Sequence, residues 1–331
     1  MAQHGRPILV APDSFKGSFS ADEVAQALAE GLATAGWQCD LAPLADGGEG
    51  TAGVLVRRLG GSTRTARVSG PLGRTLEGSF GLLADALAVV EVASASGLEL
   101  VPEDERDAEA ASSLGTGELI LAALAAGAQH VLVAAGGSAS TDGGAGAIGA
   151  ITQGGGLREA KLTVLCDVRT PYELAAARFG PQKGADPEAV ERLERRLARF
   201  ASELPRDPRG LPLSGAAGGL AGGLWAAFDA ALRPGAPFVL ETIGFDKRLR
   251  SAHAVVVGEG RLDATTLDGK AVAEAATRAR QLGVPAHAIV GSCTLDPFDQ
   301  RILDIQTITE ATSREALVEA AARLGRLLRE S

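Results

Sequence analysis

The chain has 331 residues, of which 46% are hydrophobic and 22% are charged, and its formal net charge is −9. This apolar content is enough for folded domains with cores, which excludes an intrinsically disordered chain. The negative net charge argues against a nucleic-acid-binding protein, since such proteins carry a basic patch or stripe.

Short apolar runs alternate along the chain with amphipathic stretches. The runs predict strands buried on both faces, at residues 8–11, 88–92, 131–135, 162–165, 254–257 and 286–291. A capping box at Ser20 and Glu23 predicts a helix that ends near Ala35. Asp186 and Pro187 predict the start of a helix that ends near Leu204, and residues 312–315 predict the start of the last helix. Strands that alternate with helices predict an α/β fold with a parallel sheet.

An aspartate follows four of these apolar runs and one further short run, at residues 41–44, and two of the five aspartates lie beside a glycine. These aspartates are Asp13, Asp46, Asp142, Asp167 and Asp263. One such residue would be an ordinary turn or N-cap residue. Because ligands of open α/β sheets bind at the carboxyl ends of the strands, five together indicate a site. Clustered carboxylates suit a divalent metal, and one of them can serve as a general base for a substrate hydroxyl.

Lysine is rare in this chain, with five Lys among its 32 Lys and Arg residues. Three of the five lie beside glycine in predicted loops, namely Lys16, Lys183 and Lys270. A lysine supplies a compact charge on a flexible stem, which suits contact with a phosphate. The alternative is that three of five is a chance result in a small sample.

Standard nucleotide-binding motifs are weak in this sequence. No Gly-x4-Gly-Lys-Ser/Thr segment is present, and two Gly-x-Gly-x-x-Gly matches begin at Gly48 and Gly144. With 43 glycines in the chain, such matches arise readily by chance. An NAD-linked oxidoreductase of small hydroxy acids is therefore a weak alternative.

Eight segments taken in order resemble the bacterial glycerate kinase family. They are residues 11–18 (APDSFKGS), 43–51 (PLADGGEGT), 91–98 (EVASASGL), 115–119 (GTGEL), 136–144 (GGSASTDGG), 179–185 (FGPQKGA), 215–219 (GAAGG) and 258–263 (GEGRLD). The resemblance runs from Ile8 to about Cys293 and implies a kinase that transfers the γ-phosphoryl group of ATP to a hydroxyl of D-glycerate.

The resemblance also implies two Rossmann- or flavodoxin-like α/β domains, one inserted into the other, with the active site in the cleft between them. We expect residues 1–70 and 245–331 to form the flavodoxin-like domain and residues 71–244 to form the inserted α/β domain. ATP and a divalent metal, normally Mg²⁺, are the implied cofactors. We expect a cytoplasmic protein that binds no nucleic acid and no membrane, and a homodimer is compatible with its size.

Roles for the motif residues are hypotheses at this point. Asp167 or Asp46 would accept the proton of the glycerate hydroxyl, and Asp142 or Asp263 would orient the metal. Lys16 and Lys183 would neutralise the transferred group or the glycerate carboxylate, for which Arg261 is a second candidate. The remaining predicted binding residues are Asp13, Ser14, Gly47, Gly48, Glu49, Gly136, Gly137, Ser138 and Thr141.

Two departures from the family pattern concern substrate preference. Only residues 152–161 link the predicted helix after the GGSASTDGG segment to the strand before Asp167, where the family has a longer link. Thr170 stands where the family has Asn. These departures motivate a second alternative, a sugar-acid sensor of the same fold that binds without turnover.

Overall fold

The computed structural model describes residues 5–330, apart from the side chain of Asp268. The chain divides into two compact units, which we call unit 1 (Met1–Asp46 with Val239–Ser331) and unit 2 (Gly47–Phe238). The expected boundaries at residues 70 and 245 are thus displaced. The reason is that β3 (Gly61–Ser69) pairs along its whole length with β4 (Thr75–Leu83), which draws residues 47–70 into unit 2.

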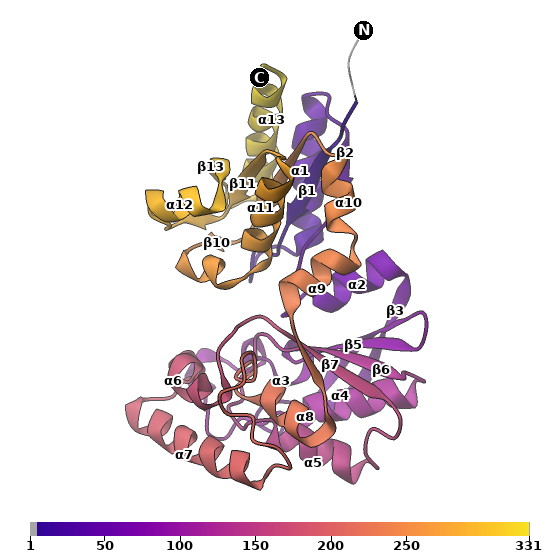
Figure 1. Ribbon diagram of the computed structural model, residues 1–331, viewed down its shortest axis with the longest axis vertical. Helices are drawn as coiled ribbons and strands as arrows, with labels where there is room; N and C mark the ends of the chain where they lie inside the picture. Colours follow the sequence, from indigo (N-terminus) through magenta and orange to yellow (C-terminus); the bar gives the residue numbers. More distant parts are fainter. Residues whose placement is uncertain (1–4, 331) are drawn as a thin grey trace. The chain divides into compact units, whose positions relative to one another are not determined.

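Unit 1 contains a five-stranded parallel sheet (Figure 1). Its strands are β1 (Ile8–Pro12), β2 (Cys39–Leu41), β9 (Ala254–Gly258), β11 (Ala286–Val290) and β13 (Ile305–Glu310). Their spatial order is β2-β1-β9-β11-β13, which is the 2-1-3-4-5 order of flavodoxin-like sheets. Three of these strands were predicted as fully buried runs, and β1, β9 and β11 confirm the prediction.

Helices cover the sheet of unit 1. They are α1 (Ala21–Thr34), α10 (Phe245–Arg250), α11 (Ala271–Leu282), α12 (Pro297–Leu303) and α13 (Arg314–Glu330), while α9 (Gly235–Thr242) spans the division between the units. Helices α1 and α13 pack together over Ile8, Val10 and Val256. The capping box of Ser20 and Glu23 is present as predicted. The last helix is instead capped by Ser313, whose hydroxyl accepts the Ala316 N–H at 3.2 Å, one residue beyond the predicted cap.

Unit 2 contains a six-stranded mixed sheet in the order β3-β4-β5-β6-β7-β8. Beside β3 and β4, its strands are β5 (Leu87–Glu91), β6 (His130–Ala134), β7 (Lys161–Cys166) and β8 (Ala231–Pro234). The pairs from β5 to β8 are parallel, as predicted for β5, β6 and β7. Strand β8 and the antiparallel edge formed by β3, β4 and β5 were not predicted. Strand β3 is largely exposed and carries polar residues, so its sequence lacks the apolar run of a buried strand.

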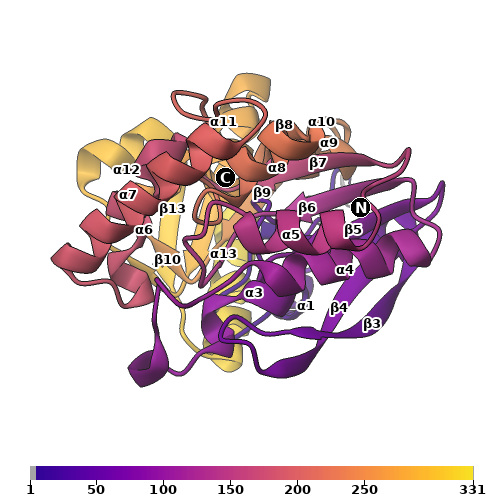
Figure 2. The same ribbon diagram turned by 90° about the horizontal axis from the view of Figure 1, so that it is seen from below.

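Helices pack on both faces of the unit 2 sheet. They are α2 (Thr51–Leu59), α3 (Ala93–Ser96), α4 (Leu114–Ala125), α5 (Ala145–Gln153), α6 (Ala175–Phe179), α7 (Pro187–Glu203) and α8 (Leu220–Phe228). Helices α4, α5 and α8 share one core with β5, β6 and β7, and Figure 2 shows α4 and α5 lying over these strands. Helix α2 packs on the other face. Helices α6 and α7 form a separate cluster around the buried ring of Tyr172.

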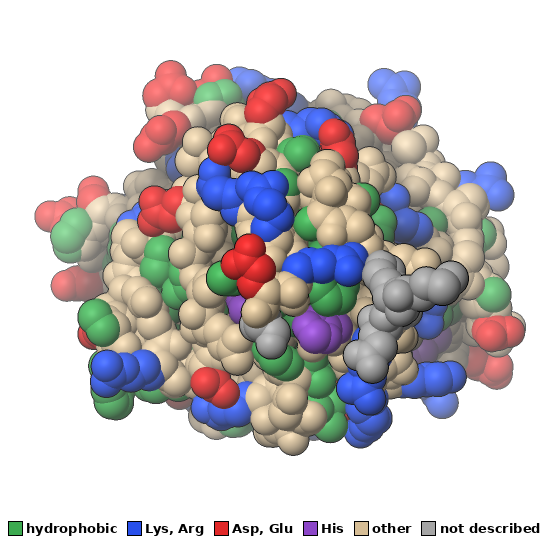
Figure 3. Space-filling model, turned by 90° about the horizontal axis from the view of Figure 1, so that it is seen from above, with side chains coloured by type: hydrophobic (Ala, Val, Ile, Leu, Met, Phe, Trp, Pro, Cys, Tyr) green, Lys and Arg blue, Asp and Glu red, His purple; other side chains and the backbone are tan. Residues whose placement is uncertain are grey.

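The surface shows mixed charge. On the face drawn in Figure 3, Lys and Arg side chains lie interspersed with Asp and Glu side chains rather than in one continuous basic area. Within residues 5–330, no helix has both the length and the apolar character that a membrane crossing requires.

Candidate active site

The carboxyl ends of β1 and β9 mark the point in unit 1 where the strand order reverses. The chain passes from β1 to β2 on one side, and β9, β11 and β13 follow on the other. Open α/β sheets bind ligands at such a switch point. Asp13 follows β1 and Glu259 follows β9, and the Asp13 N–H donates to the Gly258 carbonyl at 2.7 Å. The two carboxylates therefore flank the switch point.

A pocket of about 570 Å³ lies at this position, which we call the unit 1 pocket. The charged and hydroxyl side chains that line it include Asp13, Ser14, Lys16, Asp46, Glu259, Arg261, Asp263 and Lys270. Its volume falls within the range of about 300–1,000 Å³ that is typical of small-molecule sites. The structure thus brings together six residues of the predicted site and adds Glu259 and Lys270.

The loop after β1 carries Lys16 at an exposed tip. Phe15 is 4% exposed and its N–H donates to the Phe19 carbonyl at 2.8 Å, which closes the loop over a turn at Gly17 (φ 76°). Gly260 lies against this loop, since a Cβ on it would stand 3.2 Å from the Phe15 Cα. Burial of Phe15 therefore anchors the loop and leaves Lys16 at the pocket.

Four carboxylates line the unit 1 pocket, namely those of Asp13, Asp46, Glu259 and Asp263. The segment after β2 runs beside β1, with the Leu44 N–H donating to the Pro12 carbonyl at 2.8 Å, and this pairing brings Asp46 toward Asp13. Burial and the neighbouring charge of Asp46 raise the pKa of Asp13 well above its usual range. Burial likewise raises the pKa of Glu259 to about 7, although Lys270 and a 2.8 Å hydrogen bond from Thr266 oppose the shift. The pocket therefore concentrates negative charge that a cation would stabilise.

Cationic groups lie on the same pocket. Lys270 is the N-cap residue of α11, so the positive end of this helix dipole lies beside the pocket. Arg261 places its Nε 3.5 Å from Asp263 Oδ2. The other Asp263 oxygen accepts hydrogen bonds from the Thr265 N–H and hydroxyl at 2.9 and 2.6 Å, so Asp263 also acts as a local N-cap. Helix N-termini with nearby lysines suit anionic ligands.

Unit 2 has a smaller pocket of about 80 Å³ at the carboxyl ends of β6 and β7, which we call the unit 2 pocket. Its polar lining comes from Gly137, Ser138, Asp167, Gln182 and Lys183, and its apolar lining includes Leu98, Val168 and Phe179. Asp167 follows β7 and the Gly136–Ser138 backbone follows β6. Four residues of the predicted site therefore meet here.

Lys183 is the buried cation of the unit 2 pocket, with 2% of its surface exposed. It is the last residue of a short 3-10 helix, Pro181–Lys183, and Gly184 follows it with φ 90°. Its Nζ donates hydrogen bonds to Ser138 Oγ at 2.9 Å and to the Ser140 carbonyl at 2.6 Å. Burial lowers the pKa of Lys183 to about 8, although the charges of Asp142 and Asp167 oppose this shift.

Glycines allow a close backbone approach next to Asp167. A Cβ on Gly136 would stand 2.5 Å from the Gly48 Cα and 3.1 Å from Asp167 Oδ2. A Cβ on Gly47 would stand 2.8 Å from the Gly235 Cα. Gly47, Gly48 and Gly136 therefore lie at the same edge of the unit 2 sheet as Asp167.

Six residues of the predicted site line neither pocket, namely the three glycines beside Asp167 together with Asp142, Thr141 and Glu49. Asp142 accepts hydrogen bonds from the Ser113 N–H and hydroxyl at 2.9 and 2.8 Å and from the N–H groups of Gly144 and Gly146 at 3.0 and 3.1 Å. This bonding engages both carboxylate oxygens in fixing the loop before α5, which leaves Asp142 poorly suited to a metal. Thr141 is a fully buried residue of this same loop, and Glu49 is exposed in the turn before α2.

Sequence reasoning missed Glu259 and left Lys270 without a role. Glu259 lies within the GEGRLD segment, and its place directly after an apolar strand is the signal that could have identified it. The predicted site residues of this segment are Arg261 and Asp263. Within residues 5–330, no three His, Cys, Asp or Glu side chains are arranged to hold a metal ion by themselves.

The shortened link of unit 2 is a tight turn. Helix α5 ends at Gln153, and Gly155 (φ 95°) and Gly156 (φ 75°) reverse the chain before β7 begins at Lys161. Thr170 lies outside the residues that line the unit 2 pocket.

Comparison with known proteins gives one consistent result. The model of the glycerate kinase family matches residues 8–154 and 152–330, and the two matched ranges meet at the start of the shortened link. A glycerate kinase from Halalkalibacterium halodurans is 38% identical over 96% of each chain, and glycerate 2-kinase from Escherichia coli is 38% identical over 87% of this chain and 86% of its own.

A solved structure agrees with these sequence relatives. The crystal structure named for glycerate kinase 2 of Salmonella typhimurium LT2 has a TM-score of 0.81 and 34% identity, and the alignment covers 98% of this chain and 99% of that one. The strand-end motifs, the two α/β units and these matches agree, and the chain belongs to the glycerate kinase family.

Proposed function

We propose that this chain is a kinase that transfers the γ-phosphoryl group of ATP to a hydroxyl of D-glycerate in the presence of Mg²⁺. The observation that carries the proposal is the pair of polar pockets at strand ends of the two α/β units, each with lysine and carboxylate side chains. Family membership supports the same activity.

The unit 1 pocket suits the nucleotide phosphates. Its volume of about 570 Å³ accommodates a large ligand, and Lys16, Lys270 and the N-terminus of α11 supply positive charge. Phosphoryl transfer depends on positioning and charge neutralisation more than on covalent chemistry. These groups would bind the phosphates and hold the leaving group.

Asp13, Asp46 and Glu259 fit the requirements of Mg²⁺. Mg²⁺ is bound in proteins by one or two carboxylates together with substrate phosphates, so a complete cage of protein ligands is unnecessary. Burial and neighbouring carboxylates raise the pKa values of Asp13 and Glu259, so a bound cation would stabilise their charged forms. When bound, Mg²⁺ would neutralise charge on the phosphates.

The unit 2 pocket suits the acceptor. A pocket of about 80 Å³ fits a three-carbon acid and is too small for a nucleotide. Lys183 would bind the carboxylate of glycerate through the donor capacity that Ser138 and Ser140 leave unused. Asp167 lines the same pocket and would accept the proton of the attacking hydroxyl.

The test is a coupled assay of ADP release from ATP, Mg²⁺ and D-glycerate with the purified protein. Glycerate-dependent release supports the kinase, and phosphorus NMR of the product identifies the hydroxyl that is phosphorylated. Glycerate binding without ADP release would instead support the sensor, and a nicotinamide absorbance assay tests the oxidoreductase. No specific observation on the described residues favours the sensor or the oxidoreductase.

A further inference from the structure

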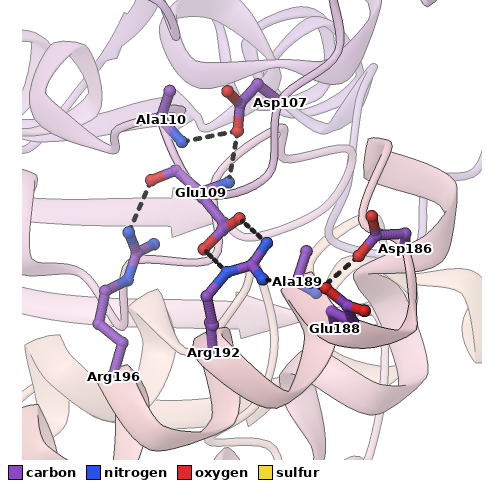
Figure 4. A network of polar contacts seen from close by, with 8 residues as sticks. All are labelled: Asp107, Glu109, Ala110, Asp186, Glu188, Ala189, Arg192 and Arg196. Atoms are coloured by element: carbon purple, nitrogen blue, oxygen red, sulfur yellow. Dashed lines mark hydrogen bonds and ion pairs between the residues drawn. The ribbon is translucent and has the colours of Figure 1, made fainter.

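Arg196 bonds the same loop that accepts the hydrogen bonds of Lys183. Arg196 lies on α7, which begins four residues after Lys183. Its Nη1 donates to the Glu109 carbonyl at 2.6 Å, and its Nη2 donates to the Thr141 carbonyl at 2.7 Å. Figure 4 shows Arg196 reaching Glu109 from α7. The guanidinium thus joins the 107–111 segment to the loop after β6.

The Thr141 carbonyl is adjacent in the chain to a group that Lys183 binds. The Ser140 carbonyl accepts the 2.6 Å hydrogen bond from Lys183 Nζ. The Thr141 hydroxyl is buried without a hydrogen-bond partner among the described residues, so it gives no help in fixing this peptide. Arg196 therefore restrains the backbone one residue from the contact that orients the Lys183 ammonium.

Arg192 lies one turn before Arg196 on α7 and serves as the control for it. It forms a two-point contact with the Glu109 carboxylate, at 2.9 Å from Nε and 2.8 Å from Nη2 (Figure 4). Both arginines therefore hold Glu109, one through its side chain and the other through its backbone. Of the two, Arg196 is the one that also bonds the Thr141 carbonyl.

We propose that Arg196 is a positioning residue for the acceptor pocket, acting through the Ser140–Thr141 backbone to hold Lys183 in place for the substrate carboxylate. This inference rests on the proposed function for the identity of the substrate. A guanidinium is suited to the task because its planar fork can hold two carbonyls at once. A lysine at position 196 could retain one of the two contacts.

The kinetic test compares Arg196→Met, Arg196→Lys and Arg192→Met in the full chain. We expect Arg196→Met to raise KM for D-glycerate by about tenfold, the effect of losing a hydrogen bond to a charged group, with a smaller change in kcat. Arg196→Lys should lie between wild type and Arg196→Met, and Arg192→Met should stay within about twofold of wild type. Equal KM values for Arg196→Met and Arg192→Met would overturn the inference.

A second measurement needs no activity and separates this inference from the proposed function. Acetic anhydride labels uncharged amines, and mass spectrometry follows the labelling of Lys183 at a series of pH values. We expect faster labelling of Lys183 in Arg196→Met and an unchanged rate in Arg192→Met, with both variants folded by circular dichroism. Unchanged labelling in both variants overturns the role of Arg196. An inactive wild-type enzyme, by contrast, overturns the kinase and leaves this labelling result valid.

Discussion

The ammonium group of Lys183 donates a hydrogen bond of 2.9 Å to the hydroxyl of Ser138, and the two residues are 2% and 5% exposed. A buried amine with this contact and that of the Ser140 carbonyl retains a charge at neutral pH, yet its pKa is lowered to about 8 because burial disfavours the charged form. The proposed carboxylate-binding group therefore titrates close to physiological pH.

The first prediction concerns the pH dependence that Lys183 produces. We expect kcat/KM for D-glycerate to fall as pH rises through about 8, since kcat/KM reports the free enzyme and the ammonium is lost there. Lys183→Met should reduce kcat/KM by about 100-fold and abolish this decline. A steady-state pH profile of both proteins checks it, and an undiminished decline in the variant would assign the titration to another group.

Stability provides the control for Lys183. Its folded pKa of about 8 lies below the ordinary 10.5, so between these values the unfolded chain holds more protons than the folded one. The contribution of Lys183 to stability therefore rises with pH in this window. The Met variant should lack this contribution, which thermal unfolding at pH 7.5 and pH 10 measures.

The second prediction concerns Asp167 as the proton acceptor. Asp167→Asn keeps the size of the side chain but removes the basic carboxylate. We expect kcat to fall by about 10²- to 10⁴-fold with little change in KM and in the melting temperature. Steady-state kinetics and calorimetry test this expectation. Retention of wild-type kcat would transfer the role of base to another carboxylate, with Asp46 as the remaining candidate of the sequence.

The third prediction is that Asp142 stabilises the fold. Asp142→Ala leaves donors of Ser113, Gly144 and Gly146 without their acceptor. We expect a loss of about 2–4 kcal/mol in the free energy of unfolding, since buried unsatisfied donors are costly. Urea unfolding measures it. If Asp142 were a metal ligand instead, the variant would show unchanged stability without metal and a weaker response to Mg²⁺.

The fourth prediction separates stability from ligand binding at Glu259. The folded pKa of about 7 exceeds the ordinary 4.5, so the folded state holds the additional proton between these values and stability falls as pH rises through this window. Glu259→Gln should therefore be more stable than wild type by about 1–3 kcal/mol at pH 8 and nearly equal at pH 4.5. Calorimetry at both pH values checks the sign.

The same Glu259→Gln variant should bind Mg²⁺ and ADP more weakly, because an amide replaces a carboxylate in the proposed metal pocket. Isothermal titration with ADP in the presence and absence of Mg²⁺ measures this effect. Equal Mg²⁺-dependent affinity in both proteins would remove Glu259 from the metal site while leaving the stability prediction intact.

Local sequence patterns were sufficient where a residue's environment follows from its near neighbours. The six predicted strands are present because a run of Val, Ile, Leu and Ala in a parallel sheet must be buried on both faces. Ser20 with Glu23 and Asp186 with Pro187 begin helices as predicted, because a cap acts within one turn. The aspartates lie near the carboxyl ends of strands because they follow those strands in the chain.

Tertiary structure decided which of those aspartates face a pocket. Asp142 and Asp167 both follow buried strands in the sequence, yet Asp142 bonds a loop and Asp167 lines a pocket. The difference depends on Ser113, 29 residues away, which no local pattern reveals.

The sequence by itself determined the alternation of buried strands and capped helices, and with it the edge of each sheet near which the candidate site residues lie. Only the tertiary structure decided that β3 pairs with β4, that Glu259 lines the unit 1 pocket with the aspartates, and that Lys183 is buried against Ser138. The physical reason is that burial and pairing arise from contacts between segments far apart in the chain. Such contacts change the pKa of a side chain without changing its sequence neighbours.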